Sequence, residues 1–168
     1  MFEKSEDLSA AELEFLEIFG KTSEVERKKL IPIFVRGFKA GYNVTRRSDE
    51  SRVVINNIES AETLTGNVVR MKGKWNPIQQ AKVLGEALGI FLGAVEYGIP
   101  KIELSNEGQS YILEIVSQLS LSLRVLNKNI KLKFIQNRIK VIARKHGGQL
   151  SRDKQILYAK IAATFSPA

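Results

Sequence analysis

One stretch of the chain, residues 77–97, limits the fold more than any other because it combines helix signals with regularly spaced small residues. Asn76-Pro77 is typical of a helix start, and Gly98 and Pro100 end the helix. Small residues recur every four positions along it: Ala81, Gly85, Gly89 and Gly93. Such a ridge lets another backbone approach closely. We therefore expect the three glycines to form an interface, and we favour packing on a neighbouring sheet or helix over a dimer face.

The chain after this helix shows two patterns that predict a small sheet. Lys101–Ser105 is a short β-like run, and apolar residues at helical spacing follow from Glu107. Apolar residues then alternate with polar ones at Leu119, Leu121, Leu123 and Val125, which is typical of a strand. Strand, helix and strand make a βαβ unit with parallel strands. The rival interpretation is one helix over 107–126, since a helical stripe also fits these residues.

The fold prediction is therefore α+β, with helices packed on a small sheet that contains the βαβ unit, and an all-α bundle is the alternative. The length of 168 residues predicts a single domain. In the first half, capping patterns predict helices over 9–19 and from Ser23, with Pro32 kinking or stopping the second. Residues 52–55 and 67–71 read as strands.

The C-terminal third contains a basic segment and a final helix. Residues 130–134 alternate and fit either a hairpin strand or the first turn of a basic helix that reaches Lys145. His146-Gly147-Gly148 breaks whatever precedes it, and Ser151 caps a last helix. A helix-turn-helix motif is not indicated, because the connection between the two helices is longer than that motif's turn.

The segment GEALGIFLGAVEYGIPKIELSNEGQSYILEIVSQLSLSLRVL leads from a helix through Gly-x-Pro to a strand, a capped helix and another strand. This order of elements resembles a small α/β domain found beside relaxases and primases of plasmids and other mobile elements. The resemblance implies an accessory role in DNA processing rather than catalysis. A relaxase nuclease site would also need a cluster of histidines, and His146 is the only histidine in the chain.

Charge is sorted along the chain. Residues 1–20 carry −5 and residues 124–160 carry +10, and no Asp or Glu occurs from Ile115 to Arg152. A net charge of +8 suits a partner rich in phosphate, an anionic surface or an acidic protein. The leading hypothesis is a cytoplasmic accessory protein that binds DNA or RNA through its basic C-terminal region. The acidic N-terminal helix would then cover that region or recruit a basic protein.

The candidate phosphate-binding residues form two groups. The first group lies in the basic C-terminal region: Lys128, Lys131, Lys133, Arg138, Lys140, Arg144, Lys145, Arg152 and Lys154. The second group is Lys72, Lys74 and Trp75, in which an aromatic ring beside cations suits stacking on unpaired bases. A core or helix-flanking place for the tryptophan is the ordinary alternative.

Two other functional classes remain as alternatives. A scaffold subunit would dock its cations on an acidic protein partner and assemble through the glycine ridge. A metal-dependent nuclease would need Glu103 together with Glu107 or Glu114. Catalysis by Cys is excluded because the chain has none, and no glycine-rich motif for a nucleotide cofactor occurs. The apolar run 83–95 is shorter than a membrane span.

Overall fold

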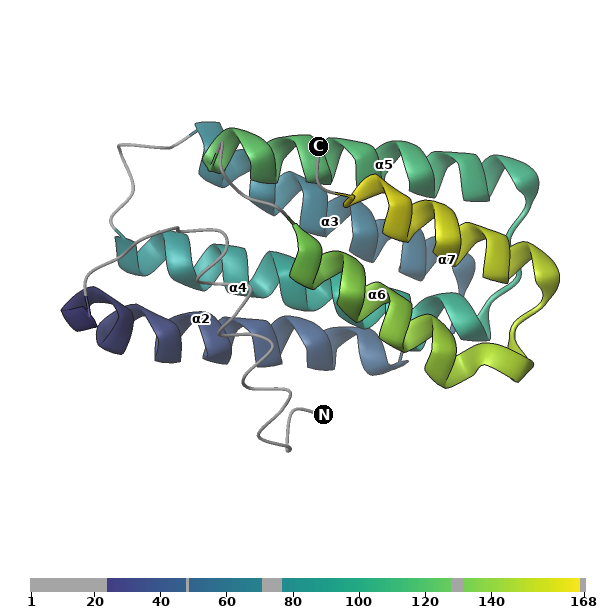
Figure 1. The fold of residues 1–168 in the computed structure, drawn as a ribbon, viewed down its shortest axis with the longest axis horizontal. Helices are drawn as coiled ribbons and strands as arrows, with labels where there is room; N and C mark the ends of the chain where they lie inside the picture. The colour runs from purple at the N-terminus through teal and green to yellow at the C-terminus, as the bar shows by residue number, and fades with distance from the viewer. Residues whose placement is uncertain (1–23, 48, 71–76, 128–131, 167–168) are drawn as a thin grey trace.

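The structure is a computed structural model, and it describes residues 24–47, 49–70, 77–127 and 132–166. These residues form helices and no strand (Figure 1). The α-helices are α2 (Glu24–Val44), α3 (Ser51–Arg70), α4 (Pro77–Gly93), α5 (Asn106–Leu126), α6 (Lys133–His146) and α7 (Arg152–Thr164). Three 3-10 turns are η1 (Thr45–Arg47), η3 (Ile99–Lys101) and η4 (Gly147–Gln149), while η2 (Ala94–Gly98) is a π-helical turn. The α+β prediction is therefore wrong, and the all-α alternative fits. The helix predicted over 9–19 lies outside the described residues.

α2 and α4 run side by side in the same direction and touch through their backbones. A Cβ atom on Gly37 would stand 2.6 Å from Lys82 O, and one on Gly89 would stand 2.9 Å from Tyr42 N and closer still to Phe38 O. Gly41, Gly85 and Gly93 are equally closed in by the opposite helix or by η1. The glycine ridge is thus an interface within the chain. The spacing of the small residues favoured packing on a neighbouring helix over a dimer face, and the structure shows such packing. Because α2 covers the glycine face of α4, a second copy cannot bind to it.

Pro32 lies inside α2 and does not stop it, so of the two predicted effects, a kink or a stop, the stop is wrong. A proline inside a helix removes one backbone hydrogen bond and costs about 3 kcal/mol. The close contact with α4 begins at Phe34, two residues after the proline, and continues to Thr45. Packing along this length keeps the helix continuous.

α3 and α5 form a second pair of helices that run in the same direction. Ile55 lies against Gly108, and the Tyr111 hydroxyl donates a hydrogen bond to Glu59. Strands were predicted at 52–55, 67–71 and 119–125; the first and last segments and residues 67–70 of the second are helical, and residue 71 lies outside the described residues. In the last one, Leu119 and Leu123 are buried whereas Leu121 and Val125 are each 56% exposed.

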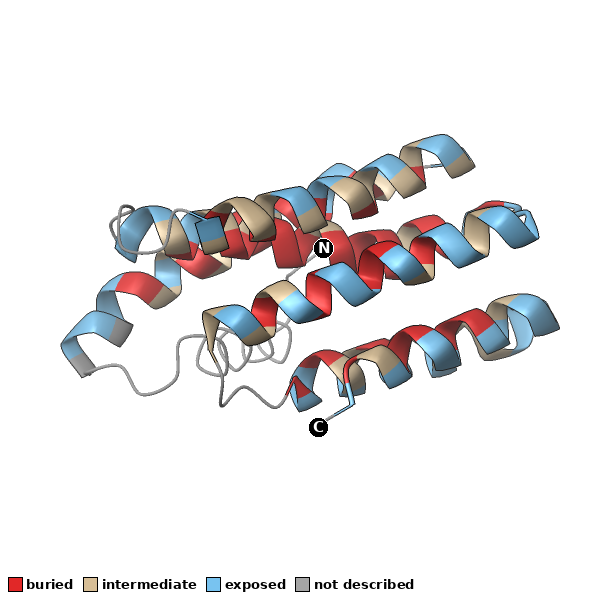
Figure 2. Ribbon diagram, turned by 90° about the horizontal axis from the view of Figure 1, so that it is seen from above, coloured by how far each residue is buried: buried red, intermediate tan, exposed pale blue. Residues whose placement is uncertain are grey.

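α6 and α7 run in opposite directions and lie on the side of the molecule turned away from α3 (Figure 1). The apolar faces of all six helices point inward, as Figure 2 shows by the buried residues on their inner sides. Of the strand expected at 101–105, Lys101 ends η3 and residues 102–105 have no regular secondary structure, so the described part of the chain has no βαβ unit. The element order of the mobile-element domain is absent from residues 85–126.

Candidate docking groove

The structure describes seven of the twelve candidate phosphate-binding residues. Lys72, Lys74, Trp75, Lys128 and Lys131 lie outside the described residues. The other seven lie on α6 and α7, but they do not share one face: Lys133, Arg138, Lys140, Arg144, Lys145, Arg152 and Lys154. Three buried isoleucines of α6, at positions 135, 139 and 142, face the core and divide the cations of that helix into two flanks.

Lys145 lies on the flank that faces the π-helical turn. Its Nζ donates a 2.9 Å hydrogen bond to Glu96 Oε1, and the Glu96 side chain is only 8% exposed. The hydrogen bond raises the pKa of Lys145 above its ordinary value. A buried carboxylate needs such a partner, so Lys145 neutralises a charge inside its own chain.

Lys154 is also used within the fold. Its Nζ donates to Pro100 O at 3.2 Å, which ties the first turn of α7 to η3. Burial lowers the pKa of Lys154. Neither Lys145 nor Lys154 is therefore a freely available contact for an external anion.

A groove of about 550 Å³ lies between α6 and α7. Its lining is mostly small and apolar, with two cations: Gln136, Lys140, Ala143, Arg144, Gln155, Tyr158, Ala159, Ala162, Ala163 and Ser166. The groove exists because alanines occupy the facing positions of the two helices, where larger side chains would fill the space.

The polar groups of the groove other than the cations are satisfied within the chain. Gln136 Nε2 donates to Ala162 O at 3.0 Å and to Ser166 Oγ at 2.7 Å. Gln155 Nε2 donates to Leu150 O at 3.1 Å. The Tyr158 hydroxyl donates to Val95 O, away from the groove, and burial raises its pKa above the ordinary value. An occupant would therefore meet an apolar floor.

Lys140 and Arg144 stand one helical turn apart on α6, and both side chains are exposed. Neither makes a hydrogen bond or an ion pair with the part of the chain that the structure describes. Two adjacent cations beside an apolar floor can bind a ligand that combines carboxylates with an apolar face. Both cations were among the candidates predicted from the sequence, whereas the alanine floor was not predicted.

The remaining sequence candidates do not form a second site. Within the described residues, no three His, Asp or Glu side chains come together as a metal site, so Glu103, Glu107 and Glu114 are not assembled for nuclease chemistry. The stretch Pro77–Lys101 is long and apolar enough to cross a membrane, but 72% of its apolar 18-residue window is buried inside the protein. Such burial is typical of a core helix.

No protein-family model, no curated protein and no solved structure matches this chain. The functional argument therefore rests on the geometry of the groove and its charges.

Proposed function

We propose that this protein is a non-enzymatic interaction subunit whose α6/α7 groove binds an acidic amphipathic helix of a protein partner. The observation that carries the proposal is the alanine floor flanked by Lys140 and Arg144. An amphipathic helix would place its apolar face on the alanines and its carboxylates beside the two cations. Charge complementarity of this kind also guides the partner to the groove.

The distribution of the cations favours a protein partner over nucleic acid. Affinity for nucleic acid grows with the number of phosphates that a protein neutralises. Lys145 and Lys154, two of the seven described candidates, are engaged within the fold. An apolar floor contributes little to phosphate contact but much to helix docking. Binding of DNA or RNA is the competing outcome of the test.

The test is a fluorescence anisotropy titration with a labelled synthetic peptide of Leu, Ala and Glu, in which Leu occupies one helical face. We expect saturable binding that weakens with salt. Single-stranded DNA, duplex DNA and RNA oligonucleotides are titrated under the same conditions. Binding of an oligonucleotide without binding of the peptide would overturn the proposal.

Two variants separate the rim from the floor. Lys140→Ala combined with Arg144→Ala should weaken peptide binding about tenfold, because two rim ion pairs are worth about 0.2–1 kcal/mol each. Ala159→Leu should fill the groove and abolish binding, and its exposed position leaves folding intact. The matched control is Arg47→Ala combined with Arg52→Ala, which removes the same charge from exposed positions outside the groove.

A further inference from the structure

The outer face of α5 carries a stripe of exposed residues at alternating spacings of four and three. The stripe consists of Glu107, Tyr111, Glu114, Gln118, Leu121 and Val125. Tyr111 is 42% exposed, and Leu121 and Val125 are each 56% exposed. This spacing is that of a seam between two packed helices. No described helix covers it, although α5 already packs on α3 and α7 through its other faces.

Gly66 on the neighbouring α3 is the second observation. Glycine inside a helix costs about 1 kcal/mol relative to alanine. The glycines of α2 and α4 allow those helices to touch, but a Cβ atom on Gly66 would meet only the end of the Arg70 side chain, at 3.6 Å. Packing among the described residues therefore gives no reason for a glycine at this position. A close approach by another molecule would explain a glycine there.

The register of the two helices places Gly66 beside the centre of the stripe. Tyr111 hydrogen-bonds Glu59, which is 52 positions earlier in the sequence, and the same offset from Gln118 gives Gly66. A shallow groove between α3 and α5 ends at this level, lined by Glu62, Thr63 and Gln118 among others.

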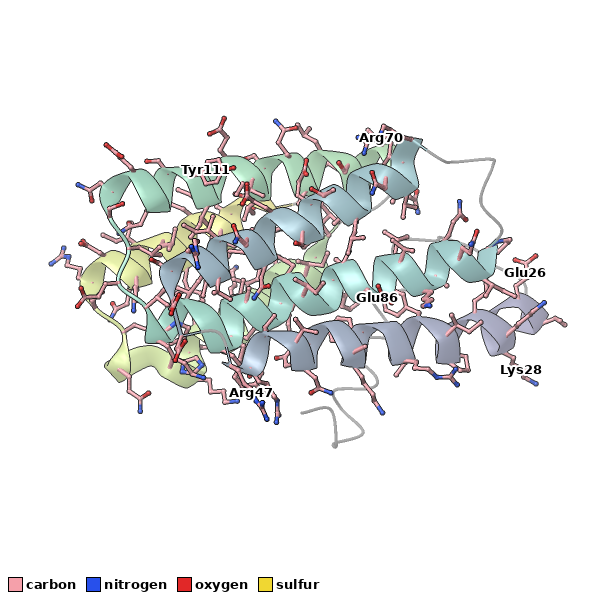
Figure 3. All side chains as sticks on the ribbon, turned by 180° about the vertical axis from the view of Figure 1, so that it is seen from behind. Glu26, Lys28, Arg47, Arg70, Glu86 and Tyr111 are labelled. Atoms are coloured by element: carbon pink, nitrogen blue, oxygen red, sulfur yellow. The ribbon has the colours of Figure 1, made fainter. Side chains whose placement is uncertain are left out.

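Charge along this face is divided between its two ends. Glu59, Glu62 and Glu114 lie around Tyr111, and Arg70 ends α3 on the other side of Gly66. Figure 3 shows Tyr111 and Arg70 in opposite halves of the α3/α5 layer. Glu62 and Arg70 are each four residues from Gly66. A two-fold axis through Gly66 and Gln118 would place Glu62 of each copy opposite Arg70 of the other copy.

We propose that a second copy of this chain binds the α3/α5 face in antiparallel orientation, with a two-fold axis at Gln118 and Gly66. A two-fold interface must complement itself, and this face does so through the pairing of Glu62 with Arg70. Tyr111 then meets Val125 of the other copy, and the helices approach closely where Gly66 lacks a side chain. The proposal is independent of the α6/α7 groove and uses different residues.

Sedimentation equilibrium of the full chain tests the mass directly. We expect a species of twice the 18.9 kDa chain mass. Gly66→Leu and Leu121→Glu should each shift the protein to the monomer while circular dichroism stays that of a folded helical protein. Val141→Glu is the matched control, since Val141 is 48% exposed on α6, and it should remain dimeric. A wild-type monomer at all concentrations, or a dimer that both variants leave intact, would overturn the proposal.

The absence of cysteine from the chain permits a second test that needs no loss of binding. A disulfide requires Cα atoms within about 7 Å, so Gln118→Cys should crosslink to its own copy under mild oxidation. Asn137→Cys is exposed on α6, outside the α3/α5 face, and it should crosslink at least tenfold more slowly. Equal rates for the two variants would exclude an axis at Gln118.

Discussion

Replacing Gly89 by alanine adds one methyl group where α4 touches α2, and it should destabilise the protein. The new Cβ would stand 2.9 Å from Tyr42 N, whereas ordinary contact begins near 3.4 Å, and Phe38 O is closer still. The helices must therefore separate by more than half an ångström. Backbone atoms cannot turn aside as a flexible side chain can, so the whole contact between the two helices loosens.

The size of the effect follows from two opposing contributions. Overpacking costs about 1–3 kcal/mol, and the rigid backbone puts Gly89 at the upper end. Alanine regains about 1 kcal/mol of helix propensity, which leaves a net loss of about 2 kcal/mol. For a protein of this length, that loss corresponds to a decrease in Tm of about 4–8 °C. Gly66→Ala has the same chemistry without the clash and should stabilise the monomer by about 0.5–1 kcal/mol.

Urea denaturation followed by circular dichroism at 222 nm measures both variants, at a protein concentration where the chain is monomeric. The two substitutions should have opposite signs. If Gly89→Ala were neutral or stabilising, α2 and α4 would not be in backbone contact, and the reasoning about the glycine ridge would fail. If both variants were equally destabilised, helix propensity and the open space at Gly66 would not explain the result.

Three further substitutions test the contacts around the groove. Lys145→Met leaves buried Glu96 without its cation and should lower the free energy of unfolding by about 1–2 kcal/mol at neutral pH. This value is reduced for solvent screening because the Lys145 side chain is 61% exposed. An unchanged urea midpoint would contradict it. Burial raises the pKa of Tyr158 above 10.0 in the folded state, so above pH 10 the unfolded chain loses the hydroxyl proton before the folded chain does. The free energy of unfolding should therefore be unaffected by this group below pH 10 and decline above it. Tyr158→Phe should make that decline shallower, and identical slopes would disprove the assignment. Ser151→Ala removes the side-chain acceptor for Lys154 N and should lower the free energy of unfolding by about 1 kcal/mol, measurable as a lower Tm.

Helix ends were the part of the fold that sequence signals predicted well. Ser151 caps α7, and the His146-Gly147 junction ends α6. α4 leads into the π-helical turn η2, which ends at Gly98. These signals are local, because a capping hydroxyl or a glycine acts on the backbone beside it. They do not depend on what the helix packs against.

The choice between helix and strand depended on packing and was wrong for α3 and for the end of α5. The buried residues of α3 lie at helical spacing, but Ala61 and Thr65 are among them, so a count of large apolar residues misses the stripe. The Thr65 hydroxyl donates to Ala61 O at 2.9 Å, which lets a polar residue be buried there. In α5 the alternation came from Leu121 and Val125, which face outward.

The same two residues explain why the α5 stripe was not recognised from the sequence. Apolar residues ordinarily indicate the core, and in the sequence an exposed apolar pair on a helix gives the same alternating pattern as one face of a strand. The alanines did not indicate a groove either, because alanine is also the residue with the highest helix propensity and occurs in helices for that reason alone. Both surfaces depend on which face of each helix is buried, and tertiary packing decides that.

The two proposed surfaces lie on different helices, and their relative position leads to a joint expectation. α6 and α7 lie on the side turned away from α3, so neither groove would be covered in a dimer through the α3/α5 face (Figures 1 and 3). A single peptide that occupies one groove would gain no avidity from dimerisation. Gly66→Leu should therefore abolish the dimer and leave the affinity for a single acidic peptide unchanged. A fall in peptide affinity in that variant would mean that the two surfaces are coupled through the fold.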